Sequence, residues 1–281
     1  MTGSLASAVW LDGRLVAADA ATVSVFDHGL TVGDGVFETL KVIGGRPFAV
    51  GRHLERLGRS AQGLGLNVPL SDAALRRVVD EVVDAAGVET ARLRITLTAG
   101  VAPFGSGRGA GQPTLVVAAA PLAPWPVETD AVTVPWPRNE RSPVTGVKTT
   151  SYAENVVMLA EARKVGASEA IMPNTRGNLC EGTGTNVFVV VGGRLVTPPL
   201  LAGCLGGVTR GLVLELVADA DEEDVPMAAL AEADEVLLTS TTRDVQPLRS
   251  LDGRPLPGAV GPVGQRAADA LARLQTRDID P

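Results

Sequence analysis

Four tight turns containing glycine divide the apolar runs of this chain and limit the folds open to it. Each turn has apolar residues on both sides, which is typical of a β-hairpin or strand pair. The four segments are Val9–Val16 around Asp12-Gly13, Leu40–Val50 around Gly44-Gly45, Val187–Thr197 around Gly192-Gly193, and Pro247–Leu256 around Asp252-Gly253. Strand pairs are therefore expected throughout the chain.

Helical periodicity appears between these strand pairs. Apolar residues from Leu75 to Val83 recur at i, i+3, i+4, i+7 and i+8, after Ser71 as N-cap and before Gly87 as stop signal. Further helices are predicted at Arg52–Leu66, Tyr152–Val165, Val208–Ala218 and Pro262–Thr276, and strands at Arg92–Thr98, Thr114–Ala120, Ala131–Trp136 and Glu235–Thr239. Helices that alternate with strand pairs predict an α/β (α+β) fold.

The length of 281 residues is sufficient for two α/β domains. Residues 121–126 contain three prolines, which is typical of an extended connector. We place a linker at 121–130, between a smaller domain at 1–120 and a larger domain at 131–281 that carries Lys148. The glycine-rich stretch Gly100–Pro113 is long for a connection between strands and is a candidate active-site loop.

Composition excludes several classes of protein. The net charge is −7, and no basic stripe is present, so we expect no nucleic-acid partner. The two cysteines lack the spacing of metal ligands or a disulfide framework, which predicts a reduced protein without a metal site. No apolar run reaches eighteen residues and no signal peptide is recognisable, so a soluble cytoplasmic protein without a membrane partner is expected.

Lys148 and Glu181 are candidates for cofactor chemistry. Lys148 follows an apolar stretch at a predicted strand-to-helix transition, and only two other lysines occur in the chain. Glu181 precedes the small polar turn 182–186 and a strand. A solvated lysine and an exposed loop glutamate are the alternatives. Together, an amine for a Schiff base and a carboxylate for a pyridine nitrogen suit pyridoxal phosphate.

Two further segments suit the phosphate of such a cofactor. Ala202–Arg210 brings glycines and a threonine to a helix start, where free amides bind anions. Thr239–Asp244 offers hydroxyls and amides at a strand end. The alternative for both segments is an ordinary capped turn.

Taken in order, the motifs resemble the class IV pyridoxal-phosphate enzymes, which include branched-chain aminotransferases, D-amino-acid aminotransferases and aminodeoxychorismate lyases. The motifs span nearly the whole chain. They are Phe26–Leu30, Gly33–Thr39, Arg52–Leu57, Lys148, Glu181–Phe188, Gly207–Arg210 and Ser240–Val245.

The resemblance implies a role for each matched residue. Lys148 forms the internal aldimine and moves the proton between the substrate Cα and C4′, and Glu181 pairs with the pyridine nitrogen. The cofactor phosphate is expected at Arg56, Val208, Thr209 and Thr241, the ring face at Leu205, and the substrate side at Phe37 and Thr242. The role of Tyr152 stays open. The resemblance further implies fold type IV, with a small two-layer α/β domain, a larger domain with a barrel-like sheet, and a homodimer.

The chain departs from some relatives on the substrate side. D-amino-acid aminotransferases and many lyases carry Arg-Gly where this chain has Ala99-Gly100. The substrate carboxylate is then left to Arg94, Arg108, Arg138 or Arg243, and the sequence does not choose among them.

Three functional hypotheses follow. The leading one is an aminotransferase that moves an amino group between an amino acid and a 2-oxo acid through a quinonoid intermediate. The second is 4-amino-4-deoxychorismate lyase, which releases pyruvate and 4-aminobenzoate. The third is a non-catalytic dimeric relative. Substrate identity and D/L preference are not predicted.

Overall fold

The computed structural model describes residues 7–257 and 260–281, which form two compact units. The described part of unit 1 comprises residues 7–123, 147–152 and 278–281, and that of unit 2 comprises 124–146, 153–257 and 260–277. The segment with Lys148 thus groups with the N-terminal unit, whereas the sequence assigned it to the domain 131–281. The reason is backbone pairing with a strand of unit 1.

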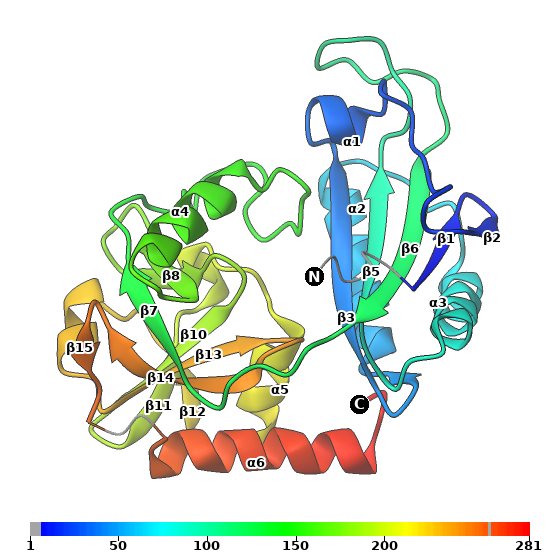
Figure 1. Ribbon diagram of the computed structural model, residues 1–281. Coiled ribbons are helices and arrows are strands. Elements are labelled where there is room, and N and C mark those ends of the chain that lie inside the picture. The colour runs from blue at the N-terminus through cyan, green and yellow to red at the C-terminus, as the bar shows by residue number, and fades with distance from the viewer. Residues whose placement is uncertain (1–6, 258–259) are drawn as a thin grey trace. The chain divides into compact units, whose positions relative to one another are not determined.

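Unit 1 is built on an antiparallel sheet of six strands with the order β2-β1-β6-β5-β3-β4 (Figure 1). Its strands are β1 (Ala8–Leu11), β2 (Arg14–Val16), β3 (Gly35–Ile43), β4 (Arg46–Pro47), β5 (Thr90–Thr98) and β6 (Thr114–Pro121), and its helices are α1 (His28–Thr31), α2 (Val50–Gly63) and α3 (Asp72–Ala86). Helix α2 packs on β3, and α3 packs on β1 and β6.

One aliphatic core joins this sheet to its helices. Leu40 and Leu93 of the sheet are fully buried with Leu57 of α2 and Leu75 of α3. Helix α3 begins after Ser71, whose hydroxyl accepts from the Ala74 amide, and ends at Gly87 in the left-handed conformation. The predicted caps and apolar face of this helix are confirmed.

Unit 2 is built on a mixed sheet with the order β12-β11-β10-β13-β14-β7-β8-β9, and β15 pairs with β14. Its strands are β7 (Thr129–Thr133), β8 (Glu169–Pro173), β9 (Leu179–Gly182), β10 (Asn186–Val191), β11 (Arg194–Thr197), β12 (Ala220–Glu222), β13 (Glu235–Ser240), β14 (Asp244–Leu251) and β15 (Arg254–Pro255). Its helices are α4 (Ala153–Lys164), η1 (Leu200–Ala202), α5 (Val208–Leu216), η2 (Met227–Ala231) and α6 (Pro262–Arg277).

Helices cover parts of this sheet, as Figure 1 shows for α6 beneath β13 and β14. Helix α4 packs on β8, and α5 packs on β13 and α6. The carboxylate of Glu235 accepts bonds from the Val263 and Gly264 amides at the start of α6, which satisfies amides that the helix leaves unpaired.

The predicted α/β class and the four strand pairs are confirmed. One strand end was wrong, because β7 stops at Thr133 rather than Trp136. Pro135 and Pro137 flank Trp136, and a proline has no amide hydrogen for a sheet. Strands β8 and β9 were not predicted.

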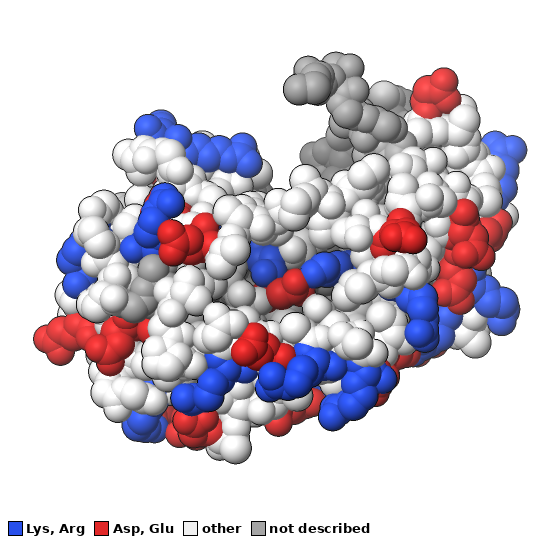
Figure 2. All heavy atoms as spheres, turned by 60° about the horizontal axis from the view of Figure 1, so that its bottom comes forward, with Lys and Arg blue, Asp and Glu red and all other residues white. Residues whose placement is uncertain are grey.

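Acidic and basic side chains are interspersed on the face shown in Figure 2. Within the described residues, no helix is long and apolar enough to cross a membrane. The same part of the chain holds no group of three or more His, Cys, Asp or Glu side chains arranged for a metal ion.

Replacing the cap of α3 tests the local account of this helix. Ser71→Ala removes the hydroxyl that accepts from Ala74, and we expect a loss of about 1 kcal/mol in the free energy of unfolding. Urea titration measures it. Exposed Ser106, in the loop after β5, provides the control. Equal effects of Ser71→Ala and Ser106→Ala would contradict the capping role.

Candidate active site

Lys148 lies on a short extended segment at the edge of β3. Thr149 forms a bridge with Val36, and the Lys148 carbonyl accepts from the Phe37 amide at 3.0 Å. On its other side, the Lys148 amide donates to Ser60 Oγ of α2 at 3.2 Å. Both backbone polar groups of the lysine are thus held by unit 1, which limits where its side chain starts.

The side chains of Lys148, Arg94 and Tyr152 all contact the ring of Phe37. The Lys148 Nζ lies 4.2 Å from the ring centroid, and the Arg94 Cζ lies 3.8 Å from it. The ring of Tyr152 meets the Phe37 ring edge to face, with 5.3 Å between centroids. The residue predicted for the substrate side, Phe37, therefore contacts the predicted catalytic lysine directly.

Arg56 belongs to a buried triad with Glu38 and His53. Its Nε and Nη2 donate to the two Glu38 carboxylate oxygens, each at 2.7 Å, and His53 Nδ1 lies 2.7 Å from Glu38 Oε2. Burial raises the pKa of Glu38, but the charge and hydrogen bonds of Arg56, with those of His53, lower it to about 2. Desolvation lowers the pKa of His53. The guanidinium is thus fixed in orientation by a carboxylate.

Glu181 is buried in unit 2 and accepts hydrogen bonds from Arg138 and Leu205. Arg138 Nε donates to Glu181 Oε1 at 3.2 Å, and the Leu205 amide donates to Glu181 Oε2 at 2.9 Å. The exposed-loop alternative is therefore wrong, because Glu181 retains 9% exposure at the end of β9. Two predicted residues, Glu181 and Leu205, are in direct contact.

The N-terminus of α5 provides an anion-binding cradle in the same unit. Its N-cap, Gly207, makes no side-chain cap, and the first helical residues are Val208 and Thr209. A Cβ on Gly207 would lie 2.0 Å from Asn186 Oδ1, so a larger residue would displace the Asn186 side chain. Uncapped amides, the positive end of the helix dipole and the Thr209 hydroxyl suit a phosphate group.

A second polar feature lies on the face of β13 beside this cradle. Thr239 pairs with Asn186, and its buried Oγ1 has no hydrogen-bond partner among the described residues. Thr241 and Thr242 follow in the turn between β13 and β14. The chemistry of these donors fits a phosphate-bearing cofactor.

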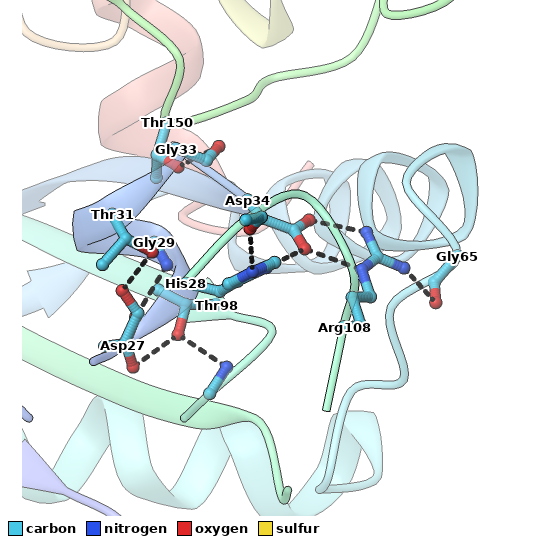
Figure 3. Close-up of polar contacts among 12 residues, drawn as sticks. Asp27, His28, Gly29, Thr31, Gly33, Asp34, Gly65, Thr98, Arg108 and Thr150 are labelled. Atoms are coloured by element: carbon cyan, nitrogen blue, oxygen red, sulfur yellow. Dashed lines mark hydrogen bonds and ion pairs between the residues drawn. The ribbon is translucent and has the colours of Figure 1, made fainter. Parts of the chain in front are cut away.

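The loop 99–113 is tied to unit 1 by the polar cluster of Figure 3. Arg108 donates to both Asp34 oxygens at 2.7 and 2.6 Å, and this bonding lowers the pKa of Asp34. Buried His28 lies 3.0 Å from Asp34 Oδ2 and 3.0 Å from the Gly105 carbonyl. Asp27 accepts from Thr98 and Thr114 at the two ends of the loop.

Four arginines were candidates for binding the substrate carboxylate, and they differ in their hydrogen-bond and ion-pair partners. Arg108 binds Asp34, Arg138 binds Glu181, and Arg243 donates to Ser168 and Gln246 while stacking on Trp125. Arg94 donates only to Thr96 within its own strand, and no described carboxylate forms an ion pair with it.

Sequence reasoning missed Glu38, and it named Arg138 only as a candidate for the substrate carboxylate. Glu38 orients Arg56, and Arg138 binds Glu181. The spacing of His53 and Arg56 by three residues on one helix was the available signal for the triad, since such residues share a helix face. Nothing in the sequence joined Arg138 to Glu181, which lies on β9.

Comparison with known proteins defines the family. The family model for amino-transferase class IV matches residues 35–251, and the chain belongs to this family. A putative branched-chain-amino-acid aminotransferase of Methanocaldococcus jannaschii is 33% identical over 281 residues, covering 96% of each chain. A D-alanine aminotransferase of Bacillus licheniformis is 32% identical, covering 94% of this chain and 95% of the relative.

Solved structures agree in fold. The crystal structure of a branched-chain aminotransferase from Thermoproteus uzoniensis with norvaline matches with a TM-score of 0.90 and 34% identity, covering 95% of this chain and 94% of that chain. The expected family, its fold and its enzymatic character are confirmed.

The triad yields a prediction about acid stability. The Glu38 pKa falls from 4.5 to about 2 on folding, so its carboxylate stabilises the protein above pH 4.5, and this contribution is lost as the pH falls towards 2. It amounts to about 3 kcal/mol. In Glu38→Gln we expect this acid-dependent part to vanish, and stability at pH 7 to fall by about 3 to 5 kcal/mol, because Arg56 stays buried without its counter-charge.

Urea titrations from pH 2.5 to pH 7 measure both effects. Glu55→Gln is the matched control, since Glu55 lies on α2 and pairs with Arg59 at the surface. Its expected cost is below about 1 kcal/mol. The role of the triad would be refuted if the free energy of unfolding of Glu38→Gln and of the native protein changed with pH in parallel.

Proposed function

We propose that this class IV aminotransferase uses pyridoxal phosphate to move an amino group between an amino acid and a 2-oxo acid. The observation that carries the proposal is Lys148, whose backbone is fixed by Phe37 and Ser60 and whose amine lies beside the Phe37 ring. Family membership supports both the reaction and the cofactor.

Several of the predicted residues serve the cofactor in this proposal. Glu181 holds the proton of the pyridine nitrogen, and Leu205 packs against the ring. The phosphate is bound by Arg56, Val208, Thr209 and Thr241. Support comes from the fixed guanidinium of Arg56 and from the uncapped start of α5. When bound, pyridoxal phosphate supplies an aldehyde that condenses with amines and a ring that withdraws electrons from the substrate Cα.

Lys148 performs the two chemical tasks of the chain. Its amine would hold the cofactor through the aldehyde carbon, with loss of water, and the freed amine would accept the proton of the substrate Cα and donate it back. Phe37 supports this amine through its ring face. Thr242 and Tyr152 line the substrate side, the latter through its contact with Phe37.

Arg94 is the residue that we assign to a substrate carboxylate. It shares the Phe37 ring with Lys148 and has no acidic partner among the described residues, unlike Arg108, Arg138 and Arg243. Ala99, where some relatives carry arginine, leaves this task to another cation. A guanidinium binds a carboxylate through two parallel hydrogen bonds.

We also propose a cytoplasmic homodimer. Phe26 and Leu30 lie beside Asp27 in the sequence, and Val101 and Phe104 lie in the loop 99–113, whose two ends donate hydrogen bonds to Asp27. All four apolar side chains are exposed, and the rings of Phe26 and Phe104 are 5.3 Å apart. Such a patch suits a contact with a second copy. Cys180 and Cys204 are free and buried, which agrees with a reducing compartment.

Single-turnover reactions test the proposed function. Purified protein loaded with pyridoxal phosphate is mixed with L-leucine, L-valine or D-alanine, without any acceptor. We expect conversion of the cofactor to its amine form and release of the matching 2-oxo acid. Lys148→Ala should slow this conversion by roughly a thousandfold, because the proton carrier is gone.

The lyase hypothesis gives a different result in the same assay. Formation of 4-aminobenzoate from 4-amino-4-deoxychorismate, with no conversion by any amino acid, would overturn the aminotransferase proposal. A protein that takes up no pyridoxal phosphate would overturn both.

Arg94→Gln tests the carboxylate assignment. The loss of a charge-assisted bond should raise the KM for the 2-oxo acid about 10- to 100-fold, with unchanged affinity for pyridoxal phosphate. Arg92→Gln, two residues along the same strand, is the control. Equal KM values in the two variants would exclude Arg94 as the carboxylate ligand.

A further inference from the structure

Glu169 is a buried carboxylate that the proposed chemistry does not use. It is the first residue of β8, and 2% of its surface is exposed. Its Oε1 accepts from the Thr183 amide at 3.0 Å and from the Thr183 hydroxyl, and its Oε2 accepts from the Thr185 hydroxyl at 3.1 Å. A Cβ on Gly182 would lie 2.2 Å from Thr185 Oγ1, so glycine is required for this packing. The turn 182–185 is wrapped around the carboxylate.

This turn joins two side chains that hold Leu205 from opposite sides. Before the turn, Glu181 Oε2 accepts from the Leu205 amide at 2.9 Å. After the turn, Asn186 Nδ2 donates to the Leu205 carbonyl at 2.8 Å. The separation of Glu181 and Asn186 across the turn therefore sets the position of Leu205, two residues before the N-cap of α5.

A second set of contacts ties the same turn to Glu181. Asn155 Nδ2 donates to the Thr183 carbonyl at 2.6 Å, and Asn155 Oδ1 accepts from Arg138 Nη2 at 3.2 Å. Arg138 in turn donates to Glu181. A change in the turn is thus transmitted to Arg138 and Leu205, which both donate to Glu181.

We propose that Glu169 is a positioning residue for the cofactor. Through Thr183 and Thr185 it sets the distance between Glu181, the partner of the ring nitrogen, and the phosphate cradle at the start of α5. This inference rests on the proposed function. Loss of a hydrogen bond between the turn 182–185 and Glu169 then weakens cofactor binding and alters protonation of the bound ring. Both effects exceed what a loss of folding stability alone would cause.

Removal of one hydroxyl donor tests this role. Thr185→Val deletes a bond to Glu169 at nearly constant volume. The matched control is Thr197→Val, because the buried Thr197 hydroxyl donates to the Val187 carbonyl at 2.7 Å elsewhere in unit 2. We expect about tenfold weaker binding of pyridoxal phosphate to the apoprotein in Thr185→Val and less than a twofold change in the control. Thr185→Ser, which keeps the hydroxyl, should restore binding.

The absorbance of the bound cofactor, titrated against pH, provides a readout that stability alone does not move. Its midpoint should shift in Thr185→Val and stay unchanged in Thr197→Val, with both unfolding midpoints measured in urea. The positioning role would be overturned if the two variants bound pyridoxal phosphate with equal affinity and showed the same pH midpoint of cofactor absorbance. Failure of the unmodified protein to bind pyridoxal phosphate would instead overturn the proposed function.

Discussion

Backbone hydrogen bonds between residues 147–150 and the edge of β3 determine where the catalytic lysine stands. Strand β3 pairs with β5 along its whole length and with β4 only at its far end, which leaves the edge near Phe37 open to another strand. The Lys148 carbonyl and the Thr150 amide bond to that edge. The amine, the Phe37 ring and Arg94 consequently gather on one unit.

Buried carboxylates hold predicted site residues within each unit. Glu38 fixes Arg56 in unit 1, Glu181 is held by Arg138 and Leu205 in unit 2, and Glu169 holds the turn beside it. A buried charge is costly unless it is fully bonded. Each of these carboxylates accepts at least two hydrogen bonds, which offset the cost of its burial and fix the geometry of the neighbouring donors.

The sequence predicted features that depend on local chemistry. Glycine turns located the hairpins, and the Ser71 to Gly87 pattern located α3 with both caps. Strands β8 and β9 escaped prediction because they are short and lack alternation, being almost wholly buried. The grouping of Lys148 with unit 1 depends on pairing with a strand more than a hundred residues earlier, which no local pattern encodes. Motif resemblance supplied Arg56 and Glu181, but their partners Glu38 and Arg138 required coordinates.

The central claim is that Lys148 is the amine that binds the cofactor covalently. The chain has only three lysines, Lys41, Lys148 and Lys164, so peptide mapping separates them cleanly. Protein loaded with pyridoxal phosphate is reduced with borohydride, digested and analysed by mass spectrometry. We predict stoichiometric labelling of the peptide that contains Lys148. Labelling at Lys41 or Lys164 instead, or no labelling at all, would contradict the claim.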